Sequence, residues 1–468
     1  MPLLDFPPEV FENVAHELVS IAGIGKAWKL RGVCREYNGG TFKAAITFDI
    51  FAKQSIEAFR PWRSLHTIFS RNLGLYLYYR SKDPLEAQPY LPDRINDMVD
   101  YLAEELEITK NSEKEVLRRD LCDKLGHPTS ASTVFCALID EHAYYGDFLS
   151  HIPFGEMDKL IAASSLGHHD LVGTVMKSLS NYDPHPVFGS PLERASTDRQ
   201  IPVLKAMLHH LGTALKDPKQ TEEVQELLKA HPFRWRYKKK NGFRLMEVIF
   251  RVLERSDLEI LTILVTWYKE EGLTFSKAMY NLLLEQAIRE STLIVFQYVL
   301  DTAYTSCDRN RSAARITFAQ YSIACTHGRE DIVELFFDRG YIDPLQTKTT
   351  ASAMIEGVRS DCIEIVELLL KAGASVNTKS KFNRQDMLPI ELAIFKKNPI
   401  ITQRLIDAGA RLPNMKGWPM HEATYEVLRQ AKISQDGGKH VLKYKRFKRM
   451  SEEDIEKYQA QHKVGAII

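Results

Sequence analysis

Apolar residues recur along much of this chain with the period of an amphipathic helix. From residue 163 onward, a small residue is followed eight positions later by an apolar helix of the form I/V/L-V-x-x-L-L. Each copy predicts two short helices joined by a turn, because packed helices need a residue without bulk where they approach most closely. The seven copies are Ala163–Leu171, Ala195–Val203, Val252–Ile260, Ala287–Val295, Ala324–Ile332, Gly357–Ile365 and Ala393–Ile401.

The copies recur at nearly regular distances. Counted from Leu171 to Ile401, the starts of the second helices lie 32, 57, 35, 37, 33 and 36 residues apart. Apart from the 57-residue step, these distances bracket the ankyrin period of about 33 residues. A fixed period of this kind predicts a stack in which each unit buries its apolar face against its neighbours. We therefore expect an all-α solenoid of helix-turn-helix units.

The copies between residues 320 and 425 resemble ankyrin repeats, and the resemblance weakens over 155–310. Two stretches are similar to the T-P-L-H-x-A opening of that family: Leu388–Ala393 and Trp418–Ala423. Glycines stand where a left-handed cap would end the second helix: Gly340, Gly373 and Gly409. The resemblance implies a non-catalytic stack that binds a protein target on the concave face formed by its β-turn tips and inner helices.

The first residues carry a second motif. Val10, Val14 and Leu18 form one apolar stripe, and a run from Trp28 to Arg35 follows a break that contains glycines. The order L/F-P-x-E-V/I, apolar helix, break and L-R-x-V-C-R resembles an F-box, whose helices dock on a Skp-type adaptor of a cullin ubiquitin ligase. The resemblance implies these adaptor-binding residues: Pro8, Val10, Val14, Leu18, Leu30, Val33 and Cys34.

The same segment departs from the F-box pattern at two places. Gly23-Ile24-Gly25 stands where that family usually has an acidic residue followed by leucines, and Glu36-Tyr37 replaces a basic residue and a tryptophan. The alternative to adaptor docking is a helical cap that covers the first repeat, since the ends of a repeat stack need a polar outer face.

These patterns divide the chain into four parts. The 57-residue step exceeds one period of about 33 by about 24 residues, so we expect an insertion inside the repeat region. The parts are an F-box-like segment at 1–49, a helical linker or solenoid extension at 50–150, ankyrin repeats at 151–425 with the insertion near 213–243, and a basic tail with a short helix at 426–468.

The longest predicted β-turn tip, from Asn377 to Asp386, mixes basic residues with an aromatic one. This composition is typical of an interface hot spot, although a polar solvated loop is the alternative. The candidate contact residues are Lys379, Lys381, Phe382 and Arg384.

Two segments concentrate basic charge. Residues 231–240 interleave bases with aromatics, which suits nucleobases or acidic peptides, or else forms a solvated hairpin. The tail between Lys439 and Arg449 contains no acidic residue and indicates a nuclear import signal, an acidic-partner patch or a solvated arm. We regard nucleic-acid binding as the least favoured function. The import candidates are Lys443, Lys445, Arg446, Lys448 and Arg449.

Composition narrows the functional classes. The 468 residues are 44% hydrophobic and 26% charged with a net charge of +1, so no global field attracts nucleic acid or membrane. Six cysteines without C-x-x-C spacing indicate reduced thiols in an intracellular protein, cytoplasmic or nuclear. Neither a signal peptide nor a membrane span is expected.

No sequence motif indicates catalysis. Gly25-Lys26 lacks the rest of a phosphate loop, because Ser20 and Ala27 occupy positions that need glycine and a hydroxyl residue. The adjacent pairs His168-His169 and His209-His210 point about 100° apart on a helix, which makes poor metal sites. We expect no enzyme activity, cofactor, metal or small-molecule substrate. The chain is predicted to be a substrate receptor of a ubiquitin ligase, or alternatively an ankyrin scaffold or regulator without a ligase link.

Overall fold

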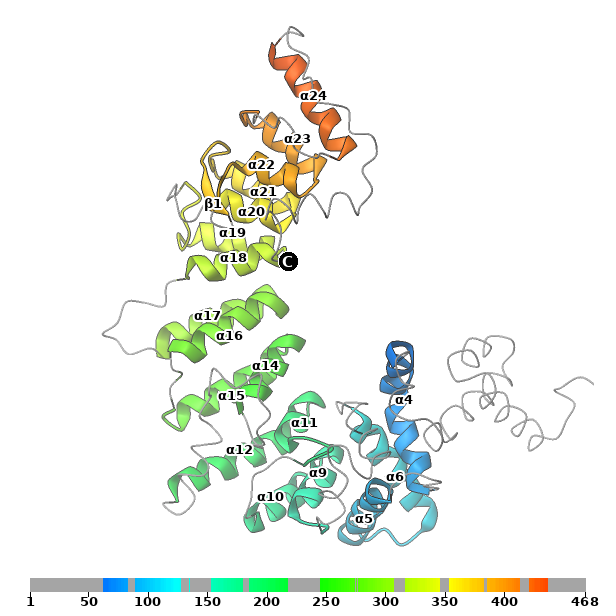
Figure 1. The fold of residues 1–468 in the computed structure, drawn as a ribbon. Helices are drawn as coiled ribbons and strands as arrows, with labels where there is room; N and C mark the ends of the chain where they lie inside the picture. The colour runs from blue at the N-terminus through cyan, green and yellow to red at the C-terminus, as the bar shows by residue number, and fades with distance from the viewer. Residues whose placement is uncertain are drawn as a thin grey trace, which may run out of the picture. The chain divides into compact units, whose positions relative to one another are not determined.

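In the computed structural model of the chain, the described residues are 62–82, 89–127, 134, 153–179, 185–217, 245–273, 275, 277–306, 316–345, 353–382, 385–412 and 421–436. Within these ranges the regular elements are helices, apart from one hairpin of two three-residue strands (Figure 1). The chain forms two compact units, one of Met1–Val252 with Asp257–Leu273 and one of Leu253–Ser256 with Thr274–Ile468.

Among the described residues of the first unit, helices α4, α5 and α6 come first and paired helices follow. Helices α4, α5 and α6 contact one another, and both α5 and α6 pack against α9, the first helix of the first pair. The bounds are α4 Trp62–Lys82, α5 Tyr90–Glu105, α6 Asn111–Gly126, α9 Glu156–Leu166, α10 His169–Ser178, α11 Pro191–Thr197, α12 Ile201–Lys216, α14 Leu245–Arg255 (whose last residues belong to the second unit) and α15 Leu258–Glu270.

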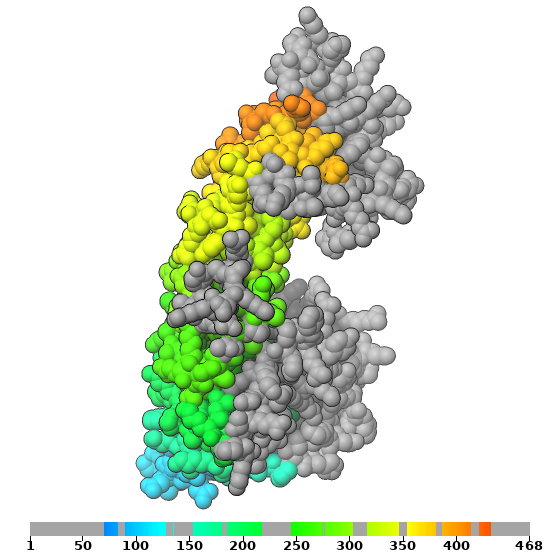
Figure 2. Space-filling model, turned by 90° about the vertical axis from the view of Figure 1, so that its left-hand side faces the viewer, coloured from blue at the N-terminus to red at the C-terminus, as the bar shows by residue number. Residues whose placement is uncertain are grey.

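The second unit stacks its hairpins in sequence order (Figures 1 and 2). First helices contact first helices in the order α16, α18, α20 and α22, and second helices contact second helices in the order α19, α21 and α23. The bounds are α16 Lys277–Glu290, α17 Leu293–Ser306, α18 Phe318–Thr326, α19 Glu330–Asp338, α20 Ala353–Ser360, α21 Ile363–Lys371, β1 Ser380–Phe382, β2 Gln385–Met387, α22 Pro389–Phe395, α23 Pro399–Asp407 and α24 Glu422–Asp436.

All seven predicted hairpins are present, so the predicted all-α solenoid is confirmed over the described residues. The small residue of each copy lies in the first helix and is buried, including Val252 at 3% exposure. Helix α12 continues through Lys216, which places residues 213–216 of the expected insertion inside a helix. The remainder of that insertion, the segment 1–49 and the basic tail beyond 436 lie outside the described residues.

Five of the seven turns between paired helices share one geometry. The carbonyl of the small residue accepts a hydrogen bond from the N–H five positions later, for example from Arg329 to Ala324 at 3.0 Å. The residue before that donor has a positive φ, as at Gly328 with 64°. This is the Schellman turn, which satisfies carbonyls left free at a helix end. The same bond joins His168 to Ala163, Gln200 to Ala195, Asp257 to Val252 and Asn398 to Ala393.

Several of these left-handed positions are not glycine. Arg199, Ser256, Asp361 and Lys397 have φ values of 54°, 56°, 63° and 60°. A left-handed residue other than glycine costs about 1–2 kcal/mol, which the bonded turn and the buried helices offset. After the second helices, in contrast, glycine occupies the left-handed position, as predicted for Gly340, Gly373 and Gly409.

Gly357 shows why the small residue matters. A Cβ atom built on Gly357 would lie 2.5 Å from Leu369 Cδ1, so in this repeat even alanine is too large unless Leu369 moves. Leu369 is fully buried, whereas its neighbours Leu368 and Leu370 are only partly buried. Helices α20 and α21 therefore reach their close packing through a glycine.

A buried carboxylate joins helix α5 to α9, the first helix of the first described repeat. Asp158 of α9 accepts hydrogen bonds from Arg94 Nη1 of α5 at 2.9 Å, from His185 Nε2 at 3.0 Å and from the Gly155 N–H at 2.8 Å. His185 Nδ1 accepts the N–H of Phe188 at 2.9 Å, so Nε2 carries the single ring proton. Burial lowers the pKa of His185 and keeps its imidazole neutral. We call Arg94, Asp158 and His185 the Asp158 clamp.

A second buried cation reinforces this connection. Arg194 of α11 is 1% exposed and donates to the carbonyls of Lys124, Leu125 and His127 at 3.1, 3.3 and 3.0 Å. These carbonyls end helix α6, where a positive charge is favoured by the helix dipole. Burial lowers the pKa of Arg194 to about 10. The end of α6 is thus fixed against the second repeat.

The left-handed turn predicts opposite effects of glycine at two adjacent lysines. Lys397 has a φ of 60°, whereas Lys396 has a φ of −70°, and both side chains are exposed. We expect Lys397→Gly to leave the free energy of unfolding unchanged or raise it by up to about 1 kcal/mol. Lys396→Gly should lower it by about 0.5–1 kcal/mol through backbone entropy. Urea unfolding of the two variants checks this, and equal losses would contradict the turn geometry.

The burial of Leu369 predicts a large cost for its truncation. Leu369→Ala removes a side chain that is 0% exposed, and should lower the free energy of unfolding by about 2–5 kcal/mol. Denaturant titration of the second unit's transition measures this. A loss below about 0.5 kcal/mol, as at surface sites, would show that the register of α21 is wrong.

The Asp158 clamp predicts a loss of stability in mild acid. Unfolded histidine binds a proton below about pH 6.5, whereas folded His185 with its lowered pKa does not. The unfolded state therefore gains protons as the pH falls, and each pH unit costs up to about 1.4 kcal/mol.

The pKa values of His168 and His210 are lowered by burial too, so the test compares wild type with His185→Gln. The stability advantage of wild type should shrink between about pH 7.5 and pH 5.5 in chemical denaturation. Parallel losses in the two proteins would place the titration elsewhere.

Candidate interaction surface

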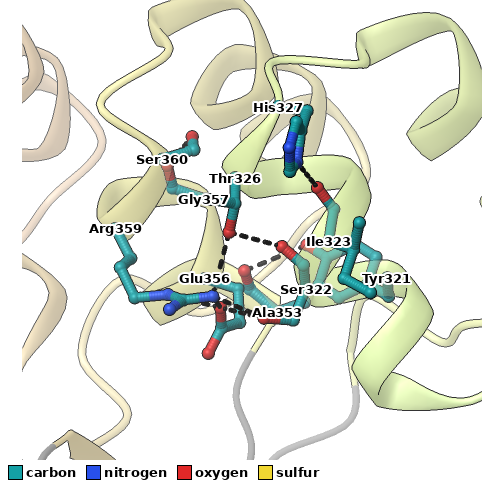
Figure 3. Close-up of polar contacts among 10 residues, drawn as sticks. All are labelled: Tyr321, Ser322, Ile323, Thr326, His327, Ala353, Glu356, Gly357, Arg359 and Ser360. Atoms are coloured by element: carbon teal, nitrogen blue, oxygen red, sulfur yellow. Dashed lines mark hydrogen bonds and ion pairs between the residues drawn. The ribbon is translucent and has the colours of Figure 1, made fainter. Parts of the chain in front are cut away.

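Polar side chains gather where two first helices of the second unit meet (Figure 3). Ser322 and Thr326 stand four residues apart on α18, and Glu356 and Arg359 stand three apart on α20. Such spacings place both members of each pair on one helix face. Because α18 and α20 pack together, the two pairs face each other. We call these four residues the Arg359 network.

The guanidinium of Arg359 is held from both helices. Its Nε donates to Glu356 Oε2 at 2.7 Å, and its Nη2 donates to Thr326 Oγ1 at 3.0 Å and also to Ser322 Oγ. The hydroxyl of Ser322 in turn donates to Glu356 Oε2 at 2.8 Å. These bonds fix the side chain in one orientation, and among the described contacts none involves Nη1.

Burial differs across the ion pair. The side chain of Glu356 is 18% exposed and that of Arg359 is 34% exposed. The carboxylate therefore lies deeper and the guanidinium nearer the solvent. An arriving partner would meet the positive group first, already ordered, which reduces the entropy lost on binding.

A buried hydroxyl fixes the spacing of the same two helices. Tyr321 of α18 is 0% exposed and donates its phenolic hydrogen to the carbonyl of Ala353, the first residue of α20, at 3.0 Å. Burial raises the pKa of Tyr321 well above its usual value. At the other end of α18, His327 is exposed and its Nδ1 lies 3.0 Å from the Ile323 carbonyl. The start of α20 and the end of α18 are thus both held by hydrogen bonds beside the Arg359 network.

Equivalent positions in the neighbouring first helices extend this surface. The two residues that follow the small residue by two and three positions lie near the C-terminal end of each first helix. Cations and hydroxyls predominate there, with one acid and one aromatic residue. The eight residues of these end rows are Arg289, Glu290, Thr326, His327, Arg359, Ser360, Phe395 and Lys396.

The predicted β-turn tip is a strand hairpin. Lys379 is exposed directly before β1, and Lys381 and Phe382 lie in β1, opposite Asp386 and Gln385 of β2. Arg384 lies outside the described residues. Sequence reasoning singled out this tip and missed the Arg359 network. The signal that could have found it is Glu356-x-x-Arg359 on a first helix, with hydroxyls four residues apart on the preceding one.

The other predicted sites lie outside the described residues. These are the F-box-like residues of 1–49, the basic and aromatic stretch 231–240, and the import candidates of the tail. Two of the cysteines expected to be reduced, Cys122 and Cys325, are buried free thiols whose pKa values burial raises to about 12.

The described ranges contain neither a membrane-spanning helix nor a cluster of metal ligands. No helix within them is long and apolar enough to cross a membrane. Nor do three or more histidine, cysteine, aspartate or glutamate side chains gather there as metal ligands would.

Comparisons with known proteins do not assign the chain to a family. No family model matches the chain, and no curated protein matches it. Among solved structures, the chain is similar to the ankyrin repeat domain of Bcl-3, a member of the IkappaB family, with a TM-score of 0.29 and 19% sequence identity. That match covers 40% of this chain and 85% of the Bcl-3 domain.

Proposed function

We propose that this chain is a non-catalytic interaction protein whose helical repeats bind a protein target. The binding surface would comprise the end rows of the first helices in the second unit. The end row of α22 lies at its C-terminal end, while the β1–β2 hairpin precedes its N-terminal end. The Arg359 network is the observation that carries the proposal. Nothing about hairpin packing requires four polar side chains to be ordered at the surface, whereas recognition benefits from groups fixed in advance.

The repeat architecture suits this role. Successive first helices contact one another, so corresponding side chains recur along one side of the stack. Schellman turns hold the ends of α18 and α22 in place, while the residues of the end rows differ in chemistry. A stack of this kind gives a rigid surface whose specificity is set residue by residue.

The finer proposal is that the protein is a substrate receptor of a cullin ubiquitin ligase. Its support is the F-box resemblance of residues 1–49. A receptor needs a firm link between its adaptor-binding segment and its repeats. Helices α4–α6, which follow that segment in the chain, are joined to α9 through the Asp158 clamp. The departures at Gly23–Gly25 and Glu36-Tyr37 favour the alternative, an ankyrin-type scaffold or regulator without an adaptor.

Adaptor capture tests the finer proposal. Val14→Asp places a charge in the predicted apolar stripe, where an unpaired charge costs several kcal/mol. Capture of a purified Skp-type adaptor by the full chain should fall at least about a hundredfold, since each 1.4 kcal/mol is tenfold in affinity. His16→Asp introduces the same charge on the opposite side of the predicted helix and should leave capture unchanged.

Thermal unfolding distinguishes the remaining outcomes. An unchanged melting transition in Val14→Asp, together with lost capture, supports adaptor docking. If wild type captures no adaptor, the scaffold function stands instead. If Val14→Asp melts the repeats, residues 1–49 act as a structural cap.

A further inference from the structure

The end rows carry more positive than negative charge at the surface. Arg289, Arg359 and Lys396 occupy equivalent regions of α16, α20 and α22, and Thr326 and His327 occupy the corresponding place on α18. Arg289 and Lys396 are exposed, as are Thr326 and His327. Three of these four repeats therefore present a cation near the C-terminal end of the first helix, two positions after the small residue in α16 and α20 and three positions after it in α22.

Building on the proposed function, we infer that the end rows bind an extended acidic segment of the target protein, with Arg359 as the central anchor. A guanidinium carries five N–H donors, so Arg359 can stay bonded to Glu356, Ser322 and Thr326 and still donate through Nη1. In the Arg359 network, Nε and Nη2 donate hydrogen bonds to Glu356, Ser322 and Thr326. These bonds leave Nη1 oriented toward a partner. Held in this way, Arg359 loses little entropy on binding.

Helix spacing sets the register of the acidic segment. Packed helices lie about 8–10 Å apart. A chain in the extended polyproline II conformation advances about 3.1 Å per residue with three residues per turn, so every third side chain points the same way. One carboxylate about every third residue would therefore meet successive end rows of α16, α18, α20 and α22. A run of adjacent carboxylates would crowd one or two rows and leave the others unoccupied.

The density of charge favours a peptide over a nucleic acid. Nucleic-acid surfaces neutralise a phosphate with each of several clustered cations. The end rows hold three lysine or arginine residues across four repeats, together with the acidic Glu290. Glu356, which is less exposed than Arg359, forms an ion pair with it. Thr326 and His327 add no further donor, because the Thr326 hydroxyl donates to the Ser322 carbonyl at 2.7 Å and His327 Nδ1 lies 3.0 Å from the Ile323 carbonyl.

The test measures binding of two labelled peptides to the full chain by fluorescence anisotropy. One carries a glutamate at every third position in a glycine and serine background, a spacing of about 9 Å, and the other is an isomer with its glutamates adjacent. We expect the spaced peptide to bind at least tenfold more tightly. Equal affinities would show attraction by charge alone and would overturn the inference.

Variants assign the interaction to Arg359. Arg359→Gln should weaken binding of the spaced peptide at least tenfold, and Arg359→Lys should weaken it as well, because an ammonium with three N–H donors cannot keep the bonds to Glu356, Ser322 and Thr326 and still donate to the peptide. The matched control is Arg404→Gln. Arg404 is 48% exposed and pairs with Glu367 between the second helices α23 and α21, away from the end rows. Its loss removes one charge and should leave the affinity unchanged.

A second variant guards against a folding defect. Thr326→Asp places a carboxylate beside the guanidinium of Arg359, where it should occupy the site from within the chain and repel the peptide. Thr326 is exposed, so the melting transition should persist. Full affinity in Thr326→Asp or in Arg359→Gln would overturn the inference. So would tighter binding of a single-stranded RNA that is lost in Arg359→Gln, since the end rows would then read phosphate.

Adaptor capture keeps the two proposals separate. Residues 1–49 lie far in sequence from the end rows, so Arg359→Gln should capture the adaptor as wild type does. Capture without binding of either peptide by wild type rejects the acidic-segment inference and leaves the proposed function intact.

Discussion

The repeats depend on one hydrogen bond that recurs in five of the seven hairpins, from the N–H of one residue to the carbonyl five positions before it. At Ala324 this bond reverses the chain through the left-handed residue Gly328. The reversal brings the two helices close together, and the residue at their contact is alanine or glycine in six of the seven hairpins. Close contact in turn lets the apolar faces bury each other, as at Gly357 and Leu369, where the left-handed residue is Asp361. Backbone geometry thus comes first, and the core follows from it.

Buried charge serves the same end in the first unit. Removing a carboxylate such as Asp158 from water is costly, and its three hydrogen-bond donors offset that cost. If either Arg94 or Asp158 were buried without the other, it would be an uncompensated charge. The Asp158 clamp therefore requires both residues, and with them α5 and α9, to be buried together. Arg194 does the same for the end of α6. Polar pairing here specifies which elements meet, while apolar burial supplies the driving force.

Sequence patterns predicted the hairpins because apolar periodicity and small residues are local signals. They did not predict partners distant in sequence: Arg94 and Asp158 are 64 residues apart, and Ser322 and Arg359 are 37 apart. Nor did they mark Lys397 as left-handed, because lysine carries no signal for that conformation and only the turn enforces it. The hairpin tip was located from its length and composition, yet the ordered polar network lies on the helices, where exposed polar residues look alike in sequence.

This division between local and distant signals has a physical basis that bears on function. The turn fixes the backbone through main-chain atoms, so the end-row side chains contribute little to folding and are free to differ between repeats. The two first helices α18 and α20 show the consequence, because Thr326 and Arg359 each stand two positions before a left-handed residue, Gly328 and Asp361. Hydrogen bonds among Ser322, Thr326, Glu356 and Arg359 order these side chains. We propose that this order serves recognition, which makes Arg359, rather than any core residue, the place to look for the partner's chemistry.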